Sequence, residues 1–225
     1  MKPIAQVFAI MTCALTLTFC AGSRDRPIKF VYLALGASDA VGVGAIPLTD
    51  GYVYLIKRDL DRRMPGVFLM NLGVPAARID LIKEEVRLAA QVGTKAQLVT
   101  LWTGANDLVN GDDPKVFQED LRAMLGIVKS DISKTIVIAN LPDLTKLPRF
   151  RERPSPSVTA ERVAAYNQAI AQEAKRVDAK LLDFFAIPVQ DDLVFDVDGF
   201  HPNNAGHQAI AREFLRVILP TLNLR

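Results

Sequence analysis

Five short apolar runs alternate with segments of helical periodicity along this chain, and this alternation constrains the fold more than any other feature. The first run, 28–35, is almost continuously apolar, which is typical of a strand buried on both faces of a parallel sheet. Later runs lie at 67–72, 97–102, 135–140 and 180–183, and apolar residues recur at helical spacing in 51–64, 78–91, 114–128, 158–177 and 204–219. The pattern predicts an α/β fold, a three-layer α/β/α sandwich around a parallel sheet of about five strands.

Length and charge narrow the class of protein further. The chain has 225 residues, half of them hydrophobic, which suits one domain with one core. Its 27 basic and 25 acidic residues leave a formal net charge of +2, so no extended field is available to hold nucleic acid. We therefore expect a small-molecule partner, no nucleic acid, and a monomer.

The N-terminal segment has the pattern of an export signal. Lys2 precedes an apolar run over 4–19, and the small residues Ala21, Gly22 and Ser23 follow it. The run is short for a membrane span of about 20 residues. We therefore interpret 1–22 as a signal peptide and 27–225 as the folded domain, which would act outside the cytoplasm, in the periplasm or the extracellular space.

Both cysteines belong to this segment, so the domain has no disulfide framework. The sequence from Leu17 to Cys20 resembles a bacterial lipoprotein processing site, in which the cysteine becomes the lipidated first residue, although Phe19 stands where a small residue is usual. Lipidation of Cys20, giving a membrane tether, and ordinary cleavage near Ala21 or Gly22 both stay open.

Polar and small residues follow four of the predicted strands. In a parallel sheet the loops after the strands meet at one edge, so residues far apart in sequence can converge there. Ser38 in this position is a candidate nucleophile, and His201 a candidate base, because imidazole has the unperturbed pKa that general-base catalysis near neutral pH needs. The stretches concerned are 36–39, 71–73, 104–107 and 198–201.

Attack of a serine on an ester carbonyl places negative charge on the carbonyl oxygen, and preorganised hydrogen-bond donors stabilise that charge. Gly73 would allow close backbone approach, and Asn106 offers an amide N–H₂ group without a competing charge. Each has a simpler reading, Gly73 as a turn residue and Asn106 as a helix cap.

On these motifs the chain resembles the SGNH hydrolase superfamily, also called GDSL esterases and lipases. The four signature residues match in order as Ser38, Gly73, Asn106 and His201, and the resemblance covers nearly the whole chain after the signal. It implies a flavodoxin-like sandwich and a serine esterase, without cofactor or metal, that hydrolyses acyl esters of a lipid, a lysophospholipid or an acetylated carbohydrate through an acyl-enzyme intermediate. The N-terminal signal predicts that this enzyme is exported.

The resemblance also assigns roles. Ser38 would be acylated, and His201 would act as base and then as acid. An aspartate three residues before the histidine orients it in this family, and this spacing selects Asp198 over Asp196. The oxyanion hole would consist of the backbone N–H groups of Ser38 and Gly73 with the side chain of Asn106.

The chain departs from the family pattern beside the nucleophile. Where Gly-Asp-Ser-Leu is usual, it has Ala37 before Ser38 and Asp39 after it. The missing carboxylate leaves an alternative function open, a non-catalytic envelope module that binds a glycan or a lipid on the same fold.

Other features carry less weight. We interpret His207 as structural, and two histidines do not suffice for a metal site. The glycines at 42 and 44 lack the full dinucleotide-binding fingerprint. The proline-rich stretch 141–156 breaks every periodicity and is expected to be a long loop, whose basic residues between Lys146 and Arg153 either attract an anionic group or are simply solvated.

Overall fold

The computed structural model of this chain describes residues 28–224. The predicted signal peptide, with Cys13 and Cys20, lies outside the described residues.

Five strands form one parallel sheet in the order β2-β1-β3-β4-β5, as the apolar runs predict. They are β1 (Phe30–Gly36), β2 (Val67–Gly73), β3 (Leu98–Trp102), β4 (Ile136–Ala139) and β5 (Lys180–Leu182).

Eight α-helices accompany the sheet in the described part of the chain. They are α1 (Ser38–Val41), α2 (Tyr52–Arg63), α3 (Ile79–Gln91), α4 (Ala105–Asn110), α5 (Pro114–Ile127), α6 (Pro148–Glu152), α7 (Ala160–Arg176) and α8 (Asn204–Thr221). Short 3₁₀ turns lie at Leu48–Asp50, Leu144–Lys146 and Asp191–Leu193, and one π turn at Val128–Ile132.

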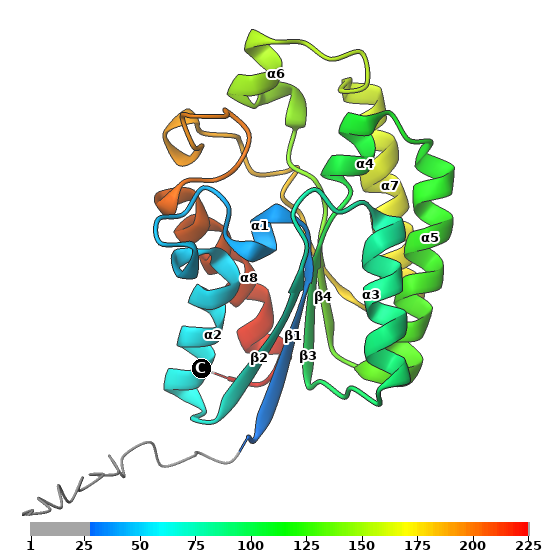
Figure 1. Cartoon of the computed structure of the whole chain (residues 1–225), viewed down its shortest axis with the longest axis vertical. Helices are drawn as coiled ribbons and strands as arrows, with labels where there is room; N and C mark the ends of the chain where they lie inside the picture. Colours follow the sequence, from blue (N-terminus) through cyan, green and yellow to red (C-terminus); the bar gives the residue numbers. More distant parts are fainter. Residues whose placement is uncertain (1–27, 225) are drawn as a thin grey trace, which may run out of the picture.

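The helices cover both faces of the sheet and complete a three-layer sandwich (Figure 1). Helices α2 and α8 pack on one face, and α3, α5 and α7 on the other. The alternation of side chains along β1 divides the core accordingly, because Leu33 and Leu35 join the cluster under α3 and α5, whereas Tyr32 and Ala34 join the cluster under α2 and α8. Within residues 28–224, no helix combines the length and the apolarity that crossing a membrane requires.

The strand order reverses direction at β1, which lies between β2 and β3. Open α/β sheets bind their ligands at such a switch point, outside the carboxyl ends of the strands. Gly36 at the end of β1 allows β3 to approach closely, because a Cβ there would lie 2.8 Å from the carbonyl oxygen of Trp102. Ser38 and Asn106 follow β1 and β3, so the topology brings both to this point.

The structure corrects one local expectation and defines the start of α2. The stretch 141–156 is not a plain loop, since it contains α6, which begins at Pro148 with the proline as its first residue; proline suits that position because the first helical N–H has no intrahelical acceptor. Gly51 is the N-cap of α2, and Asp50 just before it lies in a 3₁₀ turn and pairs with Arg58 at 3.0 Å.

Candidate active site

Ser38 is the first residue of α1, directly after β1 and the single linking residue Ala37. Its side chain is 6% exposed at the carboxyl edge of the sheet. Ala37 is the N-cap of this helix and supplies no side-chain hydrogen bond to it. The backbone N–H of Ser38 lies in the first turn, where a helix leaves its N–H groups without intrahelical acceptors.

The His201 ring lies between Ser38 and Asp198. Its Nε2 atom is 2.8 Å from the Oγ atom of Ser38, and its Nδ1 atom is 2.6 Å from the Oδ2 atom of Asp198. The sequence separates Ser38 from His201 by 163 positions. The arrangement is a continuous hydrogen-bonded relay from a carboxylate through an imidazole to a hydroxyl.

Asp198 is fixed by the turn to which it belongs. Its Oδ1 atom accepts the backbone N–H groups of Phe200 and His201, at 2.9 and 3.0 Å. Partial burial alone would raise the pKa of Asp198, but its hydrogen bonds to His201 and Phe200 hold that pKa below its usual value. Asp196, the alternative orienting residue, is exposed, and it is Asp198 whose carboxylate lies against the ring.

Helix α6 supports this turn from outside. Gly199 has a φ of +63°, and its carbonyl oxygen accepts the backbone N–H of Arg149 at 2.9 Å. A Cβ at Gly199 would lie 2.8 Å from the Arg149 nitrogen, so both the backbone conformation and the close approach require glycine. A short antiparallel bridge between Val194 and Pro202 closes the loop beneath the turn.

Asn106 lies on α4 and lines the cavity beside Ser38. Its Nδ2 atom donates one hydrogen bond to the carbonyl oxygen of Ala77, at 2.8 Å. The amide group carries a second hydrogen. The contact fixes the side chain and leaves that second donor for a ligand.

Gly73 differs from the expectation for a free oxyanion donor. Its backbone N–H donates to the Oδ1 atom of Asn71 at 3.0 Å, while the Asn71 Nδ2 atom donates to the carbonyl oxygen of Ala40. A Cβ at Gly73 would lie 2.9 Å from the Cβ of Ala40. The glycine therefore allows β2 to approach α1, and its N–H is already engaged within the protein.

The turn after β2 holds another donor that sequence reasoning missed. Ala76 has a φ of +61°, which is unusual for a residue with a Cβ, and among residues 28–224 no acceptor pairs with its backbone N–H. The neighbouring Ala77 carbonyl is the group that Asn106 binds. An alanine gives no sequence signal for a left-handed conformation, so only the coordinates identify this N–H.

Asp107, next to Asn106, connects two helices instead of contacting the cavity. Its Oδ1 atom accepts the backbone N–H of Ile79 at the start of α3, at 3.0 Å, and its Oδ2 atom has no partner in the described structure. Burial raises the pKa of Asp107 to about 6, against the hydrogen bond from Ile79 that lowers it. The carboxylate anchors α4, and with it Asn106, to the second helical layer.

His207 is structural, as the sequence indicated, although it has partners that the sequence did not reveal. Its Nε2 atom donates to the carbonyl oxygen of Val43 at 3.0 Å, and its Nδ1 atom accepts the backbone N–H of Tyr52 at 3.2 Å. Burial lowers the pKa of this fully buried ring. His207 thereby joins α8 to the start of α2 and to the loop after α1.

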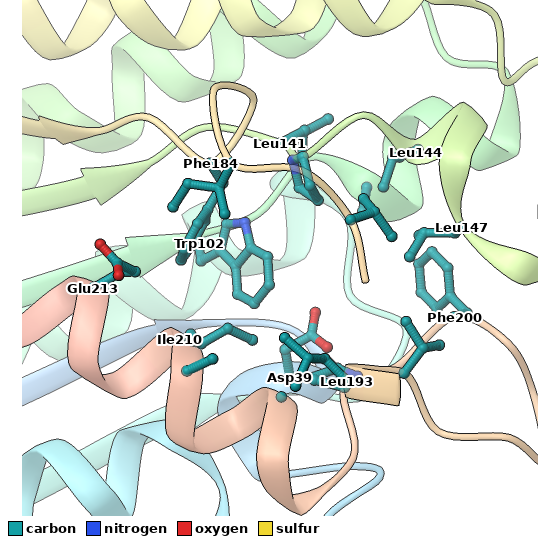
Figure 2. Close-up of a pocket in the computed structure, with 18 of the residues that line it drawn as sticks. Asp39, Trp102, Leu141, Leu144, Leu147, Phe184, Leu193, Phe200, Ile210 and Glu213 are labelled. Carbon is teal, nitrogen blue, oxygen red and sulfur yellow. The ribbon is translucent and has the colours of Figure 1, made fainter. Parts of the chain in front are cut away.

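A cavity of about 160 Å³ opens beside Ser38 (Figure 2). Its walls are mainly apolar, with aromatic rings from Trp102, Phe184 and Phe200 and leucines from the segment before α6. Asp39 also lines it, and burial raises the pKa of this carboxyl to about 6, while His201 lowers it and Asp198 raises it. The cavity suits an apolar group of a bound molecule more than a heavily hydroxylated one.

Two of the four basic residues in 146–153, Arg149 and Arg151, contact other side chains. Arg151 pairs with Asp191 at 2.5 Å, and the guanidinium of Arg149 lies over the rings of Phe150 and Phe200. A second pocket at this position combines two arginines with several carboxylates, namely Arg149, Arg153, Glu152, Asp191, Asp196 and Asp198. This mixed charge argues for solvated side chains and not for an anion site. In the part of the chain that the structure describes, no three His, Cys, Asp or Glu side chains are grouped so as to hold a metal ion.

A relay of carboxylate, imidazole and hydroxyl at the switch point of an α/β/α sandwich is the site of a serine hydrolase. Residues 34–209 match the model of the GDSL-like Lipase/Acylhydrolase family, and the chain belongs to this family. It is an ester-hydrolysing enzyme of that class, so the non-catalytic alternative is set aside.

Individual relatives agree with this membership. The spore germination lipase LipC of Bacillus licheniformis is 24% identical over 198 residues, which cover 81% of this chain and 93% of the relative. An esterase, EstA, from Pseudoalteromonas sp., solved in a form inhibited by monoethylphosphonate, has a TM-score of 0.68 at 20% identity, covering 86% of this chain and 98% of that one. A catalytic mutant of the acetylxylan esterase Axe2 from Geobacillus stearothermophilus has a TM-score of 0.66 at 21% identity, covering 86% and 96%.

Proposed function

We propose that this chain hydrolyses carboxylic esters through an acyl-enzyme formed on Ser38. The observation that carries the proposal is the unbroken contact from Asp198 through His201 to the Ser38 hydroxyl. A serine hydroxyl is a weak nucleophile near neutral pH and needs a base in this position.

In the first half of the reaction the Ser38 Oγ atom attacks the ester carbonyl carbon, and the His201 Nε2 atom takes the hydroxyl proton. The tetrahedral intermediate collapses with cleavage of the bond to the alcohol oxygen, which receives that proton. In the second half water repeats the attack on the acyl-enzyme, again giving its proton to His201, and the acid leaves as the Ser38 hydroxyl is restored. Asp198 holds the ring with its Nδ1–H toward the carboxylate and stabilises the imidazolium that forms.

The developing oxyanion needs donors close to Ser38. We assign the Ser38 backbone N–H and the free amide hydrogen of Asn106, each of a kind that contributes about 3 kcal/mol. We propose the Ala76 N–H as the third donor, because it has no acceptor in the described chain and the Asn106 side chain binds the carbonyl of the neighbouring Ala77, whereas the N–H of Gly73 is engaged. Asn106→Ala should then lower kcat by about 10²–10³-fold with little change in KM.

The direct test is the Ser38→Ala variant, assayed by p-nitrophenol release from short-chain acyl esters. Release should fall to the rate without enzyme, while the circular dichroism spectrum stays that of the wild type. Ser130→Ala is a matched control on the exposed surface and should retain full activity. Wild-type activity in Ser38→Ala would refute the proposal.

The apolar cavity favours substrates with a longer apolar acyl chain over acetyl esters of a carbohydrate. Across p-nitrophenyl acetate, butyrate and hexanoate, kcat/KM should rise by up to about fourfold per buried methylene, the equivalent of about 0.8 kcal/mol. Ile210→Ala removes part of the cavity wall and should flatten this trend, whereas Leu88→Ala, an exposed position on α3, should not. A preference for acetate would contradict this substrate assignment.

We also propose that the protein acts outside the cytoplasm, on the basis of the apolar segment at 4–19 and the small residues that follow it. Mass spectrometry of the protein recovered from cell fractions tests this. A mature N-terminus at acylated Cys20 supports a membrane tether, an unmodified N-terminus near Ala21 or Gly22 supports release, and a chain that retains residues 1–22 contradicts export.

A further inference from the structure

We propose that Asp39 determines substrate specificity, and that it selects esters carrying a substituted ammonium group within a few bonds of the scissile carbonyl. This inference rests on the proposed esterase function and specifies its substrate class.

The first step is the position of the carboxylate. Asp39 follows the nucleophile in α1 and lines the same cavity as Ser38. Figure 2 shows its carboxylate directed into that cavity, in the space between Trp102 and Phe200. An ester bound with its carbonyl at Ser38 therefore has one of its substituents beside this carboxylate.

The second step is the absence of a protein partner. Among residues 28–224, no side chain donates a hydrogen bond to Asp39 and no Lys, Arg or His forms an ion pair with it. No Lys or Arg of the described chain lines the cavity. The other carboxylate in the wall, Glu213, is already paired with Arg216 at 3.1 Å. The carboxylate of Asp39 is thus the unpaired charged group that a ligand in the cavity would contact.

The third step is the chemistry of the walls. Trp102 and Phe184 pack together with their ring centroids 5.0 Å apart, and the Trp102 indole N–H is satisfied by the carbonyl oxygen of Asn140. These rings therefore present apolar faces and edges to a ligand, and the Trp102 N–H is not available as a hydrogen-bond donor. An alkylated ammonium matches this combination, because its carbon groups fit apolar and aromatic walls while its charge is attracted by ring faces and by a carboxylate.

Other substituents fit less well. A carboxylate or phosphate on the substrate would be repelled by Asp39 with no neighbouring cation to offset the repulsion. A sugar carries several hydroxyl groups, and the cavity offers few polar groups to pair with them.

The experiment compares three butyrate esters of similar size in a pH-stat assay: butyrylcholine, its neutral isostere 3,3-dimethylbutyl butyrate, and an ester of an alcohol that bears a carboxylate. For the wild type, kcat/KM for the choline ester should exceed that for the neutral isostere by about tenfold, with the anionic ester lowest. The ratio of kcat/KM for the choline ester to that for the neutral isostere should approach one in Asp39→Asn and in Asp39→Leu. Two variants are used so that a folding defect in one of them leaves the other to test the inference.

Two control variants separate this carboxylate from general charge effects. Asp80→Asn and Glu84→Gln, both at exposed positions of α3 outside the cavity, should keep the wild-type ratio. A ratio near one in the wild type, or one that survives the loss of Asp39, overturns the inference. An equal loss on all three esters in Asp39→Asn also overturns it, because it would indicate a role in positioning His201. If none of the three esters and no p-nitrophenyl ester is hydrolysed, the proposed function itself fails.

Discussion

Two carboxylates of the candidate active site, Asp198 and Asp39, differ in nearly every respect. Asp198, in the loop before α8, makes three hydrogen bonds, to the His201 ring and to two backbone N–H groups, and its pKa is lowered. Asp39, in α1, has no side-chain partner, and burial raises its pKa to about 6. The three hydrogen bonds of Asp198 leave its carboxylate to orient the His201 ring. The carboxylate of Asp39, which has no side-chain partner, remains available to a substrate. We therefore propose different tasks for the two carboxylates, because their surroundings differ.

The largest expected effect is the loss of kcat on substitution of Asp198, compared with the nearby Asp196. Asp198→Asn removes the acceptor that holds the Nδ1–H of His201 and should lower kcat for p-nitrophenyl butyrate by about 10³–10⁴-fold. Asp196→Asn, two residues away and exposed, should remain within about twofold of the wild type. Similar losses in the two variants would mean that the relay is assigned to the wrong carboxylate.

The second prediction turns the difference in pKa into a difference in stability. The folded-state pKa of Asp39 lies above the unfolded value of about 3.9, so folded protein binds a proton more tightly and loses stability as pH rises between about 4 and 6. Asp39→Asn should therefore be more stable than the wild type at about pH 8, by up to about 3 kcal/mol, and equally stable at about pH 4. Urea denaturation across this range measures the difference in unfolding free energy between Asp39→Asn and the wild type, and a difference that widens toward acid pH would contradict the assignment.

The lowered pKa of Asp198 has the opposite effect on stability. Its stabilisation is present above the unfolded pKa and disappears as pH falls through the folded pKa.

Asp107 sharpens the comparison because it is an intermediate case. It is 2% exposed and has one partnered and one unpartnered oxygen. At about pH 4.5, where both raised carboxyls are mostly protonated, Asp107→Ala should lose about 2 kcal/mol of unfolding free energy, because the N–H of Ile79 is left buried without an acceptor. Asp39→Asn should lose almost none under the same conditions. Equal losses would show that partners do not distinguish the two carboxyls.

The smallest effect concerns the residue between the sheet and the nucleophile. Ala37 caps α1 without a side-chain hydrogen bond and is 8% exposed. A carboxylate at this position would be buried close to Asp39, so Ala37→Asp should lower turnover of p-nitrophenyl butyrate by less than about tenfold instead of raising it. A clear increase in kcat would show that the usual aspartate of the family still fits here, and that its absence weakens the enzyme.

The same contrast explains which parts of the molecule the sequence predicted. The strands were predicted because runs such as 28–35 are almost continuously apolar, which is the pattern of a strand buried on both faces of a parallel sheet. Asp198 was chosen over Asp196 because the resemblance to the SGNH hydrolases places the orienting aspartate three residues before the histidine, and in the structure the backbone of that turn hydrogen-bonds to the Asp198 carboxylate. Helix α6 was missed because the prolines of 141–156 were interpreted as breaks, although Pro148 begins the helix.

The remaining differences between expectation and structure concern hydrogen bonds and backbone conformations that leave no pattern in the sequence. The N–H of Gly73 is engaged by Asn71, which in turn reaches α1, and neither contact leaves a pattern in the sequence. The left-handed conformation of Ala76 is equally invisible, since alanine has no preference for it. The orientation of Asp39 into the cavity depends on the packing of α1 against β2 and α2, which only the folded chain defines.

The central claim is that Ser38 is the nucleophile activated by His201, and phosphonylation tests it most directly. The protein is treated with a fluorophosphonate, digested, and analysed by mass spectrometry for the site and stoichiometry of the adduct. One adduct per chain, located on Ser38, lost in Ser38→Ala and strongly slowed in an alanine variant of His201, is the predicted result. Active enzyme that carries no adduct on Ser38, or that is inactivated by an adduct on another residue, would contradict it.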